Sequence, residues 1–507
     1  MAPNPNSYLN VKTDFGAVGD GSTDDTAAVR NAIGEAIRMG GATVYVPHGT
    51  YKISGIEVTG SFSLVGDGES SVLFSDDRTR SVLKINNAAG SVWRSFKIKS
   101  TAAGDYTKRN PLLNGLFLFR VERCTADELF VENTYGAGIL VSGCTGSSIE
   151  RCSVRNTLAD GIHVTGRSKD CIIARNTLTD TGDDGIAVVS YQSDQDLCER
   201  ILITGNHVVR SWSRGIAHIG GRSVTISDNL IQATAVTGIL VEEDTNYSTY
   251  QSYDTIIHHN QIVQAGTYVT PRPITGNRFG VEIASGAIGV RVDGNTVKES
   301  QTIGLAVTGG TSGVEIRGNR IFLNRGSGVQ LSDTDKILFF GNTVESNVKY
   351  GLFAARIAYG VFAGNQWLNN NFFDIDSPGT GTPSPDVQAI DNANFYQCSD
   401  CVIADNVSVD DRTDRARARV ERAIEITGSR RIKVGGNRCF VYNADPGKAI
   451  ATESFLSNNQ DCERMDLFAG SGVPNSTVYR AGQFYFRTDT KEQYVYDGAA
   501  WRKIALT

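Results

Sequence analysis

The sequence predicts an all-β protein, a right-handed parallel β-helix in which each coil of chain stacks on the one before it. Three observations carry this prediction. Glycine is far more frequent than proline (54 against 11), which indicates many turns and small residues. A turn asparagine recurs at a nearly fixed period, at Asn133, Asn156, Asn176, Asn206, Asn229, Asn260, Asn295, Asn319, Asn342 and Asn365. A Gly-aliphatic-x-aliphatic segment follows most of these, starting at Gly138, Gly161, Gly185, Gly238, Gly280, Gly304 and Gly328.

Short alternating strands joined by turns at a fixed period are typical of a solenoid of single coils. One coil cannot bury its own apolar residues, but stacked coils can, with neighbouring strands about 4.8 Å apart. We interpret the recurrent asparagine as a turn residue that adopts the left-handed conformation and bonds its equivalents in the coils above and below.

Residues 11–60 predict an end cap. Ala28, Ile33, Ala36 and Ile37 follow helical spacing, Thr23 or Asp24 can cap the helix, and Gly40-Gly41 ends it. A strand, Thr43–Val46, follows. A helix placed there covers the open end of a solenoid. The segment resembles the N-terminal cap of the pectate-lyase-like β-helix superfamily, which includes phage tailspikes, and this resemblance implies the same fold.

We therefore expect three parts: a cap with a helix (1–60), a β-helix carrying a catalytic groove (61–460), and a small C-terminal β module (461–507). The module contains two segments that predict a hairpin, Gln483–Arg487 and Gln493–Trp501, after a linker at 470–474, and it resembles C-terminal modules of phage tail proteins.

Extra residues interrupt the period at 191–199, 243–254 and 266–278. Such insertions form loops that often border a binding site.

Composition excludes some classes of function. The net charge of −6 offers no basic surface for nucleic acid, and no apolar run is long enough to cross a membrane. The first residues have neither the charged nor the apolar region of a secretion signal, so we expect a cytosolic protein, a trimmed chain or one released by lysis. Nine cysteines are an odd number for a disulfide framework. We expect Cys144, Cys152 and Cys171 to fill the core as small apolar residues, and Cys398 and Cys401 to be free thiols ahead of a metal or redox pair. We expect no metal and no cofactor.

Strand alternation decides which side chains leave the core. In Gly-Ile-x-Val the aliphatic residues point inward and x points outward. The residues directly before each glycine form another outward column, in which Asp160, Asp184 and Arg214 occupy successive coils. Asp183 lies in the turn beside them, and Glu242 is at a further outward position.

Carboxylates stacked one coil apart repel each other and split their pKa values, which gives an acid and a base near neutral pH. Glycoside hydrolysis uses such a pair. We therefore predict Asp160, Asp183, Asp184 and Glu242 as catalytic residues.

The segments Asp160-Gly-Ile, Asp183-Asp184-Gly-Ile-Ala and Ser213-Arg214-Gly-Ile-Ala-His-Ile-Gly resemble, in order, the Asn-Thr-Asp-Gly, Asp-Asp-Cys and Gly-His-Gly motifs of polygalacturonases. The resemblance implies that Asp183 is the general acid and that Asp160 and Asp184 hold the attacking water in an inverting mechanism. Arg214 replaces the histidine of the family, and Leu240 and Glu242 stand where its carboxylate-binding Arg-x-Lys is expected.

Substrate contacts are expected from polar and aromatic residues near this cluster. His163 points outward beside Asp160, whereas strict alternation turns His218 inward unless a bulge reverses it. Aromatic faces suit the C–H surfaces of sugars. The predicted substrate-binding residues are His163, Arg214, His218, Trp212, Tyr191, Tyr247 and Glu282.

The sequence thus predicts an endo-acting glycoside hydrolase that degrades a polysaccharide, extracellular or virion-associated, and forming a homotrimer as phage tailspike depolymerases do. Two alternatives stay open. A polysaccharide lyase or uronate epimerase can be built on the same fold, and a non-catalytic adhesin can bind glycan in the same groove.

Overall fold

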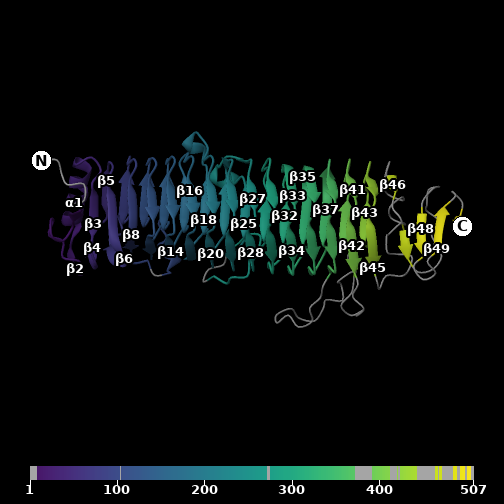
Figure 1. Ribbon diagram of the computed structural model, residues 1–507, viewed down its shortest axis with the longest axis horizontal. Helices are drawn as coiled ribbons and strands as arrows, with labels where there is room; N and C mark the ends of the chain where they lie inside the picture. The colour runs from purple at the N-terminus through teal and green to yellow at the C-terminus, as the bar shows by residue number, and fades with distance from the viewer. Residues whose placement is uncertain are drawn as a thin grey trace. The chain divides into compact units, whose positions relative to one another are not determined.

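The computed structural model describes residues 8–102, 104–270, 275–371, 391–410, 420 and 423–441, with short segments at 463–465, 468–470, 484–487, 492–496 and 500–503. It forms two compact units, one of residues 1–261 and 265–277, the other of residues 262–264 and 278–507. Each unit contains a parallel β-helix, as the sequence predicts (Figure 1). Among the described residues no helix has the length and apolar character needed to span a membrane.

The first unit begins with the predicted cap. Helix α1 (Thr26–Arg38) starts where the Asp24 carboxylate accepts the N–H of Thr26, and it ends before Gly40, whose φ is +82°. Its apolar face, Val29, Ala32, Ile33 and Ala36, is fully buried. The first strands are β1 (Leu9–Asn10), β2 (Asp20–Asp24), β3 (Thr43–Val46), β4 (Gly49–Lys52) and β6 (Ser63–Phe74). The predicted strand matches β3, and α1 lies at the N-terminal end of the stack (Figure 1).

Three parallel ladders form the coils of the first unit. The ladder that carries the site consists of β5 (Ile56–Thr59), β7 (Leu83–Asn86), β9 (Leu116–Phe119), β12 (Ile139–Ser142), β15 (Ile162–Thr165), β18 (Ile186–Val189), β21 (Ile216–Ile219) and β25 (Ile239–Glu242). The second contains β8 (Val92–Lys99), β10 (Thr125–Asp127), β13 (Ser148–Glu150), β16 (Ile172–Ala174), β19 (Leu202–Thr204), β23 (Thr225–Ser227) and β27 (Ile256–His258). The third contains β11 (Phe130–Glu132), β14 (Ser153–Thr157), β17 (Thr177–Thr181), β20 (His207–Val209) and β24 (Leu230–Gln232).

The second unit repeats this arrangement. Its strands include β29 (Val281–Ile283), β30 (Arg291–Asp293), β31 (Thr296–Lys298), β32 (Leu305–Val307), β33 (Ser312–Arg317), β34 (Arg320–Phe322), β35 (Val329–Phe340), β36 (Thr343–Glu345), β37 (Leu352–Ala358), β38 (Val361–Ala363), β39 (Gln366–Leu368), β40 (Ala393–Tyr396), β41 (Val402–Ala404), β42 (Val407–Asp410), β43 (Ile424–Thr427), β44 (Lys433–Gly435) and β45 (Arg438–Val441). Near the C-terminus, β48 (Phe484–Arg487) pairs antiparallel with β49 (Glu492–Tyr496), which confirms the hairpin. The linker residues 471–474 lie outside the described part. The division into cap, β-helix and module stays a prediction.

The recurrent glycine has a steric cause. An added Cβ on Gly161 would come within 2.4 Å of the Leu178 side chain and 2.6 Å of the Gly185 carbonyl oxygen. The backbone therefore enters each strand of the first ladder where the core leaves no room for a side chain.

The asparagine ladder is confirmed, but its backbone conformation was predicted wrongly. The side-chain oxygen of Asn206 accepts the backbone and side-chain N–H groups of Asn176, and Asn229 serves Asn206 in the same way. The left-handed residue is the one before each asparagine, for example Arg175 and Asp228. It turns the corner so that the asparagine points inward and satisfies buried backbone groups. Asn133 and Asn156, which are themselves left-handed, lie at another turn.

The described cysteines are free, as expected, and all of them except the half-buried Cys439 are buried. Burial raises the pKa of the Cys144 thiol to about 12, so this thiol stays protonated. It fills the core as a small apolar side chain.

Candidate functional site

The predicted outward column exists on the first ladder. The N–H groups of Gly138, Gly161 and Gly185 donate to the carbonyl oxygens of Asp160, Asp184 and Arg214, so these three residues occupy successive coils. The next outward column, Leu140, His163 and Ala187, is in the same register. Strand alternation and coil stacking therefore place the site as the sequence predicts.

Two carboxylates are fixed by the backbone of the following coil. Asp160 Oδ1 accepts the N–H of Asp184 at 3.0 Å, and Asp184 Oδ1 accepts the N–H of Arg214 at 2.9 Å. The second oxygen of Asp160 lies 2.6 Å from His163 Nδ1. Both residues are buried, with Asp160 8% and Asp184 4% exposed.

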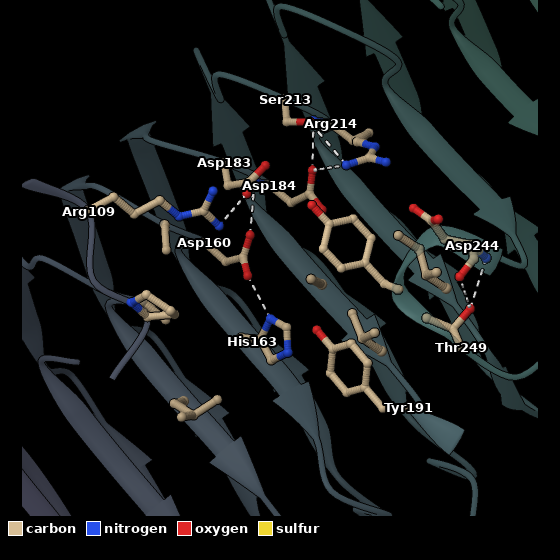
Figure 2. A pocket seen from close by; sticks show the side chains of 18 of the residues that line it. Arg109, Asp160, His163, Asp183, Asp184, Tyr191, Ser213, Arg214, Asp244 and Thr249 are labelled. Carbon is tan, nitrogen blue, oxygen red and sulfur yellow. Dashed lines mark hydrogen bonds and ion pairs between the residues drawn. The ribbon is translucent and has the colours of Figure 1, made fainter. Parts of the chain in front are cut away.

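Asp183 has a partner that the sequence did not indicate. Its Oδ2 lies 2.6 Å from Arg109 Nη2, an ion pair that Figure 2 marks. The side chain of Arg109 also contacts the Tyr106 hydroxyl. Arg109 and Tyr106 come from the segment around helix η1 (Tyr106–Lys108), which precedes β9. The unusual length of the chain between β8 and β9 is the signal that could have revealed it, because insertions in a repeat tend to border a site.

The electrostatics of the two backbone-bound carboxylates differ. Burial raises the pKa of Asp160, but the hydrogen bond and charge of His163 outweigh it, helped by the charge of Arg109, so the net pKa lies below its ordinary value. Burial likewise lowers the pKa of His163, and the Asp160 carboxylate more than reverses this. Each group of the pair thus favours the charged form of the other.

Asp184 has the opposite character. Burial and the neighbouring carboxylates raise its pKa to about 7, with burial the larger cause. The nearby Arg214 guanidinium acts in the opposite direction but does not cancel this rise. Arg214 Nη1 lies 3.5 Å from Asp184 Oδ1, and its Nη2 lies 3.7 Å from Glu242 Oε1. The site thus holds one carboxyl group that is protonated up to about neutral pH beside one that is ionised.

The site opens into a cavity of about 450 Å³. Tyr191 forms part of its wall, packed against Ala187, Val189 and Ile219, and the mostly exposed Tyr247 forms another part. Residues of each predicted insertion reach the cavity, so these loops do border the site. The lining comprises Tyr106, Arg109, Pro111, Asn114, Ala137, Leu140, Ala159, Asp160, His163, Asp183, Asp184, Ala187, Val189, Tyr191, Ser213, Arg214, Ile219, Asp244, Tyr247, Thr249 and Thr275.

Two predicted contact residues are corrected by the structure. His218 is inside the coil, fully buried, with Nδ1 3.0 Å from Thr255 Oγ1, because strict alternation holds and no bulge turns it outward. Burial lowers its pKa to about 3. Trp212 is only 7% exposed and stacks on Tyr106 with ring centroids 6.0 Å apart, so it supports the wall of the cavity and does not line it.

The two predicted glutamates also differ from expectation. Glu242 does not line the cavity and contacts Arg214 instead. Glu282 lies in the second unit, on β29, and is 6% exposed. Neither residue shares the cavity with the three aspartates.

Asp160, Asp183 and Asp184 are the one group of three possible metal-binding side chains in the described part of the chain, with one oxygen from each within 4.8 Å of the others. Arg109, His163 and Arg214 already offset much of their charge. We assign no metal to them.

Comparison with known proteins identifies the fold family. The family described as "Right handed beta helix region" matches residues 137–321 and 274–461. The chain belongs to this family. A segment of 49 residues is 59% identical to mannuronan C5-epimerase AlgE3 of Azotobacter vinelandii, and 46 residues are 61% identical to alginate lyase 7 of the same organism. These matches cover 10% and 9% of this chain, and 3% and 5% of the relatives' own lengths.

A solved structure of similar fold is the catalytic unit of a GH87 α-1,3-glucanase from Streptomyces thermodiastaticus. It superposes with a TM-score of 0.52 over 72% of this chain and 66% of that one, at 19% sequence identity. At this level of identity the similarity establishes the fold and not the activity.

Proposed function

We propose that the protein is a polysaccharide-degrading glycoside hydrolase and that the cavity on the first ladder is its active site. The observation that carries the proposal is the pair of unlike carboxyl groups, Asp184 with its pKa raised to about 7 and Asp160 with its pKa lowered. Cleavage of a glycosidic bond requires a proton donor for the leaving oxygen and a carboxylate that either activates a water molecule or attacks the anomeric carbon. The similarity of short segments to polysaccharide-modifying enzymes supports a glycan substrate.

Asp184 is the better candidate for the proton donor. Asp183, the donor by resemblance to polygalacturonases, is ion-paired with Arg109 at 2.6 Å, and such a pair favours the ionised carboxylate. Asp160 then acts as the base or nucleophile, held in place by His163 and by the backbone N–H of Asp184.

The inverting mechanism stays a prediction. Inverting enzymes typically hold their two carboxyl groups about 6.5–9.5 Å apart, and retaining enzymes about 5–5.5 Å apart. Here the nearest oxygens of the three aspartates lie within 4.8 Å of one another, which gives inversion no support. The anomeric configuration of the first product distinguishes the two mechanisms.

The test is incubation of the purified chain with a panel of polysaccharides, followed by a reducing-end assay and product mass. Hydrolysis adds one water per cleavage. Asp160→Asn and Asp184→Asn should each remove most of the activity, whereas Asp180→Asn, on the same coil but ion-paired with Arg210 away from the cavity, should retain it. Full activity in both active-site variants would refute the assignment.

Elimination or epimerisation of a uronate is the alternative, favoured by one observation. Two guanidinium groups, Arg109 and Arg214, line the cavity and could neutralise a sugar carboxylate. Both already contact aspartates, at 2.6 and 3.5 Å, so we rank this reaction second. A lyase yields unsaturated products that absorb ultraviolet light and carry no added water, and an epimerase changes the sugar without cutting the chain. Binding without any of these reactions indicates an adhesin.

An extracellular or virion-associated location and a homotrimeric assembly belong to this proposal as well. They rest on the resemblance of the cap and the C-terminal module to tailspike proteins. Light scattering of the full chain measures the oligomeric state.

A further inference from the structure

A second cavity, of about 530 Å³, adjoins the proposed active site. The loop with helix η2 (Gln192–Asp194) contributes to both, because Tyr191 lines the first cavity and Ser193–Gln195 line the second. Strand β12 also contributes to both, through Leu140 and Ser142. These positions are two residues, about 7 Å, apart along one strand face. The lining of the second cavity is Phe119, Arg120, Glu122, Ser142, Gly143, Thr145, Gly166, Arg167, Ser193, Asp194 and Gln195.

Two arginines give this cavity its chemical character. The Arg120 guanidinium lies 4.7 Å from the centre of the Phe119 ring, and this cation–π contact holds it in place. Neither Arg120 nor Arg167 lies within 4.0 Å of a carboxylate oxygen of any residue that the structure describes. Of the two acidic lining residues, Glu122 already has a cation, Arg123, at 3.4 Å. No carboxylate of the described residues therefore forms an ion pair with either guanidinium group, and Arg167 interacts with the charge of Asp196 from beyond that distance.

Asp194 Oδ2, a buried oxygen of a lining residue in η2, has no hydrogen-bond partner among the described residues. Thr165 Oγ1 is a second such atom; Thr165 does not line the cavity itself but pairs in register with Ser142, which does. A buried polar atom without a partner is costly, and a ligand that supplies a hydroxyl group removes that cost.

We propose that the second cavity is a binding subsite for a carboxylate-bearing sugar residue of the glycan that enters the active site. The guanidinium groups of Arg120 and Arg167 bind the sugar carboxylate, for which the planar fork of arginine is suited. Hydroxyl groups of the sugar donate to Asp194 Oδ2. This inference rests on the proposed action on a glycan, and it narrows the substrate to an acidic polysaccharide, although the Arg-x-Lys pair of polygalacturonases is absent.

The experiment measures binding and not turnover, so it can fail independently of the proposed activity. Calorimetry on the full chain carrying Asp184→Asn compares hexamers of galacturonate and mannuronate with hexamers of galactose and mannose. The test variant adds Arg120→Ala and Arg167→Ala, and the control adds Arg151→Ala. Arg151 is another exposed turn arginine with positive φ, ion-paired with Asp127 and lining neither cavity.

We expect one of the uronate hexamers to bind, and its neutral counterpart to bind at least roughly tenfold more weakly. The double arginine variant should lose at least roughly tenfold in affinity for the uronate, because charge-assisted hydrogen bonds are lost. Arg151→Ala should leave the affinity unchanged. The inference is overturned if neither uronate hexamer binds, if neutral hexamers bind equally well, or if the double variant binds like the control.

Discussion

Asp184→Asn should stabilise the protein at neutral and alkaline pH while removing its activity. Asp184 is 4% exposed and sits beside two other carboxylates, and burial raises its pKa to about 7. Asparagine has nearly the same shape, carries no charge, and keeps an oxygen that can accept the backbone N–H of Arg214. The substitution therefore removes the cost of ionisation with little change in packing.

The sign follows from proton binding. Between about pH 4 and pH 7 the folded protein holds a proton on Asp184 that the unfolded chain releases, so this group makes stability fall as pH rises through that range. A rise in pKa from 3.8 to about 7 lowers the stability of the wild-type protein by about 4 kcal/mol above pH 7. This is an upper limit for the gain from Asp184→Asn, because the Arg214 guanidinium loses its carboxylate partner in the variant. The loss is nearly absent at pH 4, where both states are protonated.

The assay is differential scanning calorimetry of the wild type and the variant at one scan rate across this pH range. The difference in melting temperature should grow with pH to a few degrees in favour of Asp184→Asn, since a large chain converts each kcal/mol into a small shift. Asp180→Asn, which removes a surface ion pair with Arg210, should change stability by about 1 kcal/mol or less. Parallel pH profiles for the wild type and Asp184→Asn would show that Asp184 is not protonated in the folded state.

Three further predictions concern the site and the coils. His163→Gln removes the charge that holds the pKa of Asp160 down, so the acidic limb of the pH profile of kcat/KM should move to higher pH, and an unmoved limb contradicts the pairing. Arg109→Ala should lower kcat/KM by about 10- to 100-fold at unchanged melting temperature, since the Asp183 carboxylate loses its anchor; wild-type kinetics would argue against a role. Asn206→Ala leaves a buried N–H and a buried C=O without their partner, so it should lower the free energy of unfolding by roughly 2–5 kcal/mol. Asn156→Ala, at an exposed turn, should lower it by at most about 2 kcal/mol. Calorimetry measures both.

Much of the site could be predicted because, in a β-helix, the spacing of residues along the chain determines which of them lie side by side in space. A residue one period further along the chain lies one coil further along the ladder, so Asp160, Asp184 and Arg214 had to be neighbours. Alternation within the strand also settled the orientation of His163 and of His218. For His218 the alternation was right and its prediction as a substrate contact was wrong. The asparagine ladder followed from the same period.

The sequence by itself thus determined the coil, the cap helix, the outward columns and the three aspartates, since each depends on spacing alone. Only the tertiary structure decided which charge each aspartate carries. Arg109 lies 74 residues before Asp183 and reaches it from a loop whose path no period specifies. The burial of Trp212, the contact of Glu242 with Arg214, and the second cavity, which η2 helps to line, likewise depend on how irregular loops fold over the coils. Desolvation and pairing are properties of that packing, so the division between proton donor and base appears only in the folded chain.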